Sequence, residues 1–172
     1  MSVTGQGATT GDLQALRQYR DWARFLFAIL ALLAVIGLIL VPSTAGGLDP
    51  ARIAQVWPIV LILTLNVAAT LLALLSLIRG LSRWSSWALH AVYPVCIVLI
   101  VIGTVRTLIA LTQGQINIPL EAIAGLLVLS RPHGPDLFPP ATADDRRRSA
   151  IATGVMFASY FVPLVLPLAF VT

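Results

Sequence analysis

Two oppositely charged residues lie in an otherwise apolar part of the sequence, on either side of a turn signal. Arg106 comes eight residues before Gly114, and Glu121 comes seven residues after it. If two antiparallel helices meet at Gly114, both side chains lie at nearly the same depth, roughly 10 Å from the turn at 1.5 Å of rise per residue. An unpaired charge in a bilayer costs at least about 3 kcal/mol. We therefore expect an intramembrane ion pair between them.

The ion pair has three interpretations. It fixes the two segments against each other, or Glu121 is a proton or cation site that Arg106 modulates, or both side chains snorkel to the membrane interface. Asn66 lies inside another apolar segment, where an interhelical hydrogen bond is expected and a substrate contact is the alternative. His90 raises the question of haem or chlorophyll ligation. A b-type haem normally needs a second axial histidine, and the other histidine, His133, lies in a loop. We therefore expect no cofactor, and ligation of haem or chlorophyll by His90 is the minor alternative.

The composition indicates that membrane helices position these residues. Of the 172 residues, 58% are hydrophobic and 10% are charged, and the mean hydropathy is +0.93. Soluble domains average about 25% charged residues. All 11 basic residues are arginines beside apolar segments, which favours contact with anionic lipid over nucleic-acid binding. The single Cys96 excludes an internal disulfide.

Five apolar segments have about the length of a membrane span. We expect an all-α integral membrane protein with five transmembrane helices, over residues 24–42, 55–78, 86–112, 115–131 and 147–171. The fourth segment is short and contains Pro119, so a tilted or re-entrant course is the alternative to a full span. We also expect a disordered tail over residues 1–10, a short interfacial helix over residues 11–22, and one membrane domain over residues 11–172.

The arginines alternate between the connecting segments. Nine lie in the N-terminal flank and in the second and fourth loops (three, two and four), whereas the first loop has only Arg52 and the third has none. Cytoplasmic flanks are enriched in arginine, so the N-terminus is expected inside and the C-terminus outside. This alternation requires the fourth segment to cross. Arg146, Arg147 and Arg148 precede the last span, and we interpret them as lipid headgroup anchors.

Small residues recur every four positions on the last segment, at Ala150, Gly154 and Ala158. A face of small side chains lets a second helix approach closely. We expect this helix-packing face to meet either another span of the chain or a partner subunit.

Residues 129–138, LSRPHGPDLF, follow an apolar segment. They resemble the ending after the fourth span of many small uncharacterised bacterial membrane proteins, with Leu129, Arg131, Pro132 and Phe138 in the matching positions. The resemblance covers about residues 20–138. It implies a bacterial membrane protein with Arg131 on the cytoplasmic side, and it implies no activity. The fifth span departs from that four-span pattern.

The sequence contains no HExxH metal motif, no lysine for a phosphate-binding loop and no GxSxG nucleophile elbow. We therefore expect no enzyme and no metal site. The leading hypothesis is a non-catalytic accessory or scaffold subunit of a respiratory, photosynthetic or transport complex in the bacterial inner membrane, in contact with partner subunits and anionic lipid. The alternative is a small transporter or channel component with a polar path through Arg106, Glu121 and Asn66.

Overall fold

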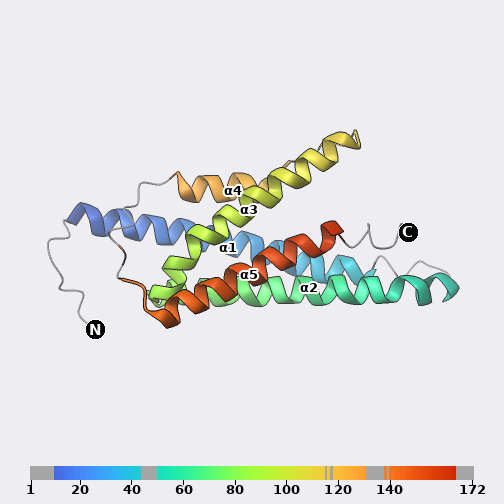
Figure 1. Ribbon diagram of the computed structural model, residues 1–172, viewed down its shortest axis with the longest axis horizontal. Coiled ribbons are helices and arrows are strands. Elements are labelled where there is room, and N and C mark those ends of the chain that lie inside the picture. Colours follow the sequence, from blue (N-terminus) through green and yellow to red (C-terminus); the bar gives the residue numbers. More distant parts are fainter. Residues whose placement is uncertain are drawn as a thin grey trace.

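The computed structural model describes residues 10–43, 50–114, 116, 118–130, 138 and 140–165. In these residues the chain forms five α-helices (Figure 1). They are α1 (Thr10–Ser43), α2 (Pro50–Ser82), α3 (Ser86–Thr112), α4 (Leu120–Leu129) and α5 (Ala143–Val165). The described part of the chain is therefore all-helical, as the sequence predicts. The expected tail lies outside the described residues except for Thr10, which begins α1.

Three of the described helices are long and apolar enough to cross a membrane, over Gly11–Leu40, Val56–Ser82 and Ser86–Thr112. Their large apolar side chains are widely exposed: Ile39, Leu65 and Leu72 have exposed fractions of 67%, 62% and 66%. So much exposed apolar surface fits the hydrocarbon of a bilayer better than water. The described part of α5 after Arg148 ends at residue 165, and residues 166–171 of the expected fifth span lie outside the described residues.

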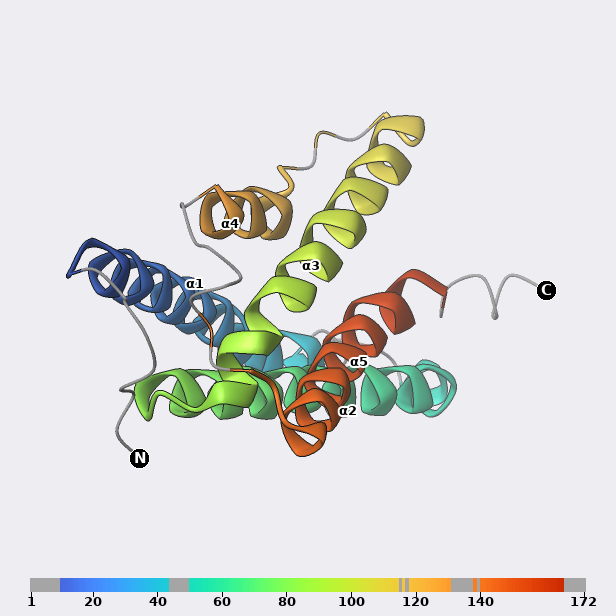
Figure 2. The same ribbon diagram turned by 60° about the vertical axis from the view of Figure 1, so that its left-hand side comes forward.

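The helices form a long layer with a hairpin rising from it. α1 and α2 lie side by side, and α5 packs across α2 and the first part of α3. Beyond that contact α3 leans away from the layer, and α4 packs against α3 (Figure 2). One continuous core fills the half of the bundle where α2 ends and α3 and α5 begin. Its largest fully buried members are Tyr19, Phe27, Leu74, Leu77, Leu81, Leu99 and Met156.

The α3–α4 contact depends on two glycines. A Cβ atom added at Gly103 would lie 2.9 Å from the backbone nitrogen of Ala122. A Cβ added at Gly125 would lie 2.8 Å from the carbonyl oxygen of Cys96 and 2.9 Å from a side-chain carbon of Ile100. Each glycine therefore lets the other helix approach more closely than any side chain would permit.

α4 is shorter than the predicted span of 115–131. Its ten residues, Leu120–Leu129, extend only about 15 Å, half of a hydrocarbon thickness of about 30 Å. Pro119 precedes the helix directly. Its ring disfavours helical backbone at the residue before it, and it has no N–H to donate. The helix therefore begins after Pro119, and its length alone does not cross a bilayer.

The predicted interfacial helix over residues 11–22 is not a separate element. α1 is helical without interruption from Thr10 to Ser43, so there is no bend between an in-plane segment and a span. Leu16, Tyr19 and Ala23 are buried at the spacing of one helix face. They extend the stripe that buries Leu26 and Leu30, so one face of this part of α1 packs on the bundle and the opposite face is exposed.

We predict that Gly125→Val lowers the thermal stability of the protein, because the new side chain collides with the backbone of α3. Overpacking of this kind costs about 1–3 kcal/mol. The free energy of unfolding is measured by circular dichroism in detergent micelles. Gly154→Val on α5 is the matched control, since no atom lies within 4 Å of an added Cβ there. Equal losses in the two variants would contradict the close α3–α4 contact.

Candidate functional site

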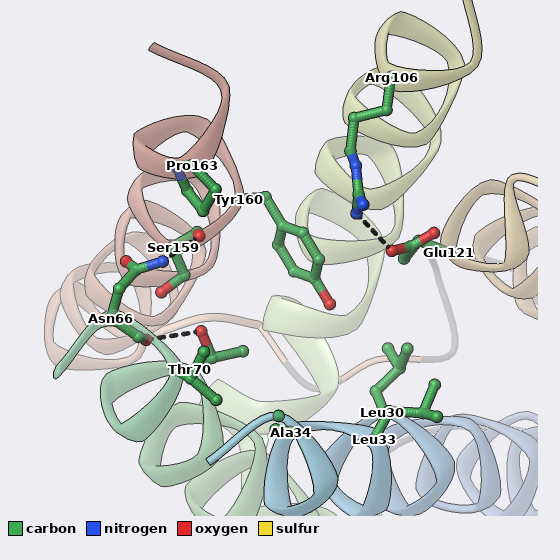
Figure 3. Close-up of a pocket in the computed structure, with 12 residues that line it drawn as sticks. Leu30, Leu33, Ala34, Asn66, Thr70, Arg106, Glu121, Ser159, Tyr160 and Pro163 are labelled. Carbon is green, nitrogen blue, oxygen red and sulfur yellow. Dashed lines mark hydrogen bonds and ion pairs between the residues drawn. The ribbon is translucent and has the colours of Figure 1, made fainter. Parts of the chain in front are cut away.

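A cleft of about 330 Å³ lies where all five helices face one another (Figure 3). It brings together the three residues of the polar path predicted from sequence: Arg106 from α3, Glu121 from α4 and Asn66 from α2. The other residues lining it are Leu30, Leu33, Ala34, Gly37, Val67, Thr70, Ser159, Tyr160 and Pro163. Polar groups from α2, α3, α4 and α5 therefore line the cleft, whereas its lining residues from α1 are all apolar.

Arg106 and Glu121 form the ion pair expected from their spacing. Nη1 of Arg106 donates to Oε1 of Glu121 over 2.8 Å. Glu121 lies in the first turn of α4, where the helix dipole favours a negative charge. The two side chains remain 42% and 23% exposed, so each keeps polar atoms accessible from the cleft.

Asn66 forms the predicted interhelical hydrogen bond, between α2 and α5. Its Nδ2 donates to the backbone carbonyl of Ser159. Beside it, Oγ1 of Thr70 donates to the carbonyl oxygen of Asn66 over 2.9 Å. Ser159 and Thr70 are both buried. The bond from Asn66 to Ser159 therefore joins α2 to α5, whereas the bond of Thr70 lies within α2.

The rise of the helices gives the distance of the cleft from Trp87 and Arg148, which line a common hollow at the start of α3 and α5. Arg106 is 19 residues beyond Trp87, or about 29 Å along α3. Ser159 is 11 residues beyond Arg148, or about 16 Å along α5. The ion pair therefore lies at the far end of α3, and the contact of Asn66 with Ser159 lies partway along α5.

Apolar side chains fill the interior of the other half of the bundle. From the level of Leu74 to that of Leu81, α2 packs against fully buried residues of α3 and α5, including Val92, Leu99 and Met156. A polar solute that enters the cleft from the Arg106 side meets this apolar core beyond Asn66. Within the described residues, the cleft therefore ends at this core.

Tyr160 is a residue of the site that sequence reasoning missed. It projects from α5 into the space between α5 and α3, on the same side as the ion pair (Figure 3). The available signal was a phenol in the otherwise apolar stretch GVMFASYFVPLV. A tyrosine hydroxyl in such a setting requires a polar neighbour or water. Ser159 and Thr70 were also missed. Single hydroxyl groups are common in apolar helices, so neither residue marks a site in the sequence.

His90 lies at the closed end, away from the cleft. Its ring meets the ring of Phe138 edge-on, with 5.6 Å between centroids, and Phe138 also lies 5.9 Å from the ring of Tyr19. Within the described residues no group of three potential metal ligands occurs. Of the resemblance segment, Leu129 ends α4 and Phe138 packs on α1 and α3, whereas Arg131 and Pro132 lie outside the described residues.

The stripe of small residues on α5 does not pack on another described helix. Ala150, Gly154 and Ala158 are all exposed. The buried face of α5 consists instead of Ser149, Met156 and Ser159, which share one side of the helix at a spacing of seven and three residues. The option of internal packing is therefore wrong for this part of the chain, and the stripe is open to lipid or to a partner.

The start of α5 is fixed by a reciprocal cap. Thr142 Oγ1 accepts from the backbone N–H of Asp145, and the Asp145 carboxylate accepts from the backbone N–H and the hydroxyl of Thr142. This hydrogen bonding holds the pKa of the Asp145 carboxyl below its usual value. Arg148 pairs with Asp144 over 2.8 Å. Arg146 and Arg147 are exposed on the same turn, as a role in headgroup contact requires.

No protein-family model, curated protein or solved structure matches this chain.

We predict that charge removal on one side of the pair destabilises the protein more than removal on both sides. Arg106→Gln leaves a carboxylate without its cation, and Glu121→Gln leaves a guanidinium without its anion, at a cost of up to about 3 kcal/mol each. The double variant loses less than the sum of the single losses, and the exchanged pair Arg106→Glu with Glu121→Arg recovers stability. Thermal unfolding in detergent measures all four. Strictly additive losses would contradict a coupled pair.

Proposed function

We propose that this chain is a component of a membrane transport system, and that it binds a small polar solute in the cleft between its helices. The observation that supports the proposal is the convergence of Arg106, Glu121 and Asn66 on one cleft, from three different helices. Polar and ionisable side chains are expensive inside a membrane and commonly mark a pathway for substrates or ions.

The proposal includes five crossings in the inner membrane of a bacterium, with the N-terminus inside and the C-terminus outside. In this topology the ten residues of α4 cover about half of the hydrocarbon thickness. In this orientation the Arg106 side faces outward and the packed core faces the cytoplasm. The cleft is then an outward-open vestibule.

The ion pair gives the cleft its binding chemistry. The guanidinium of Arg106 has five N–H donors and uses one of them on Glu121. The others can donate to a carboxylate or phosphate of a solute. The carboxylate of Glu121 can then bind a cation or a proton in place of Arg106. The hydroxyl of Tyr160 and the polar contact at Asn66 continue this path inward. Passage beyond them requires the core to rearrange or a partner subunit to complete the route.

An accessory subunit is the second candidate, and the exposed stripe on α5 favours it. Gly154 has no atom within 4 Å of an added Cβ, so a helix of another subunit has room to pack there. The two functions are compatible, since many transport systems contain more than one membrane subunit. Loss of a stoichiometric partner in Gly154→Leu, on a native gel of mildly solubilised membranes, would distinguish this role.

We predict that a membrane-impermeant thiol reagent labels Ala34→Cys and Gly114→Cys from outside the cell and does not label Ala141→Cys. Ala34 lines the cleft, Gly114 lies at the outer turn and Ala141 precedes α5. The native Cys96 is fully buried, so it gives little background, and Leu77→Cys in the packed core is the unreactive control. If Gly114→Cys were labelled and Ala34→Cys were not, the cleft would be inaccessible to water-soluble molecules, which would contradict the proposal. Labelling of Ala141→Cys from outside would overturn the topology.

We predict that Glu121→Gln abolishes solute uptake by reconstituted vesicles while the protein still inserts. Vesicles containing the native chain are incubated with a polar extract of the source cells, and mass spectrometry identifies the solutes that accumulate. Asp144→Asn removes a carboxylate outside the cleft and is the matched control. If the same solutes accumulated with native protein, Glu121→Gln and empty vesicles, the transport proposal would be wrong.

A further inference from the structure

A second hollow lies between α2 and α5, and it shares no residue with the cleft. Its volume is about 430 Å³. Three alanines whose short side chains leave space between the helices line it, together with larger apolar residues and one serine: Ala69, Ala73, Ala152, Leu72, Ile151, Val155 and Ser76. This hollow is an apolar groove on the membrane-facing surface of the bundle, and we call it the α2–α5 groove.

One end of the α2–α5 groove is polar. Arg148 and Trp87 lie there, where an indole favours the headgroup zone. From Arg148 to Val155 is seven residues along α5, or about 10 Å, so the groove enters the hydrocarbon directly below a guanidinium. A cation at the boundary and an apolar trough beneath it match the order of headgroup and acyl chain in a phospholipid.

The charge at this end of the bundle selects the headgroup. Within residues 20–24, 79–87 and 143–148 there are seven arginines and three aspartates, a net charge of 7 − 3 = +4. Arg148 is paired with Asp144, yet 60% of its side chain is exposed, and its guanidinium retains N–H donors beyond that contact. A surplus of this size attracts an anionic headgroup and is indifferent to a zwitterionic one.

We propose that the α2–α5 groove binds one molecule of an anionic phospholipid, with its phosphate at Arg148 and an acyl chain along Ala73 and Ala152. The lipid would fill a space that the chain itself leaves empty between two helices, and would join the end of α2 to the start of α5. The site is independent of the transport proposal, because the cleft lies between other faces of the helices.

Lipid binding is measured by native mass spectrometry of the delipidated full-length protein, titrated with phosphatidylglycerol or with phosphatidylcholine of the same acyl chains. The native protein is expected to bind one phosphatidylglycerol at a concentration at least about 5-fold lower than phosphatidylcholine, as roughly 1 kcal/mol per basic residue implies. Arg148→Gln should remove that preference. Ala152→Leu should weaken the binding of both lipids by filling the groove.

Controls separate this site from general attraction to the membrane. Arg83→Gln removes a cation from the same end of the bundle outside the groove, and it should keep the preference for phosphatidylglycerol. Glycerol 3-phosphate should not compete, because it has no chain to fill the groove; competition would show a phosphate site and not a lipid site. Equal affinity of the native protein for the two lipids would overturn the proposal. Unchanged lipid affinity in a correctly folded Ala152→Leu variant would also overturn the proposal, because the groove would then not be the lipid site. A helix of another protein would be the remaining occupant.

Discussion

A charged side chain can remain within this apolar bundle only where a charge of opposite sign meets it, and the contact between Arg106 and Glu121 satisfies that condition. The contact joins the last two turns of α3 to the first turn of α4 and so fixes the register of the hairpin. The glycines at 103 and 125 then bring the two backbones together over the rest of the interface. With α4 held on α3, the hairpin leans away from α5 and leaves the space into which Tyr160 projects (Figure 3).

The bundle divides into two halves with different packing. Around Leu77 and Leu99 the helices interlock through fully buried apolar side chains, whereas around Asn66 they meet through hydrogen bonds and leave a cleft. Apolar packing inside a membrane gains little from exclusion of water, so shape complementarity decides where helices stay in contact. The packed half provides a rigid base, and the polar half has the atoms that a solute can contact.

Much of the architecture could be predicted because the membrane imposes simple lengths. Helical rise alone placed Arg106 opposite Glu121. An amide in an apolar segment needs a hydrogen-bond partner on another helix, and this requirement predicted the contact of Asn66. The rotation of each helix about its own axis could not be predicted in this way. When nearly all residues are apolar, no periodicity shows which face is inward, so the exposure of Gly154 and the position of Tyr160 depended on long-range packing. The burial of Tyr19 was hidden for a similar reason, since its ring contacts Phe138, which is distant in sequence.

The shortness of α4 has a consequence for the synthesis of the protein. A helix of about 15 Å is too short to remain in a bilayer alone, so α3 and α4 must enter the membrane as one unit. Glu121 is made 15 residues after Arg106, which takes about 1–3 s at 5–20 residues per second. During that interval Arg106 has been synthesised and Glu121 has not. The contact that joins α3 to α4 therefore cannot form until the carboxylate of Glu121 has been made.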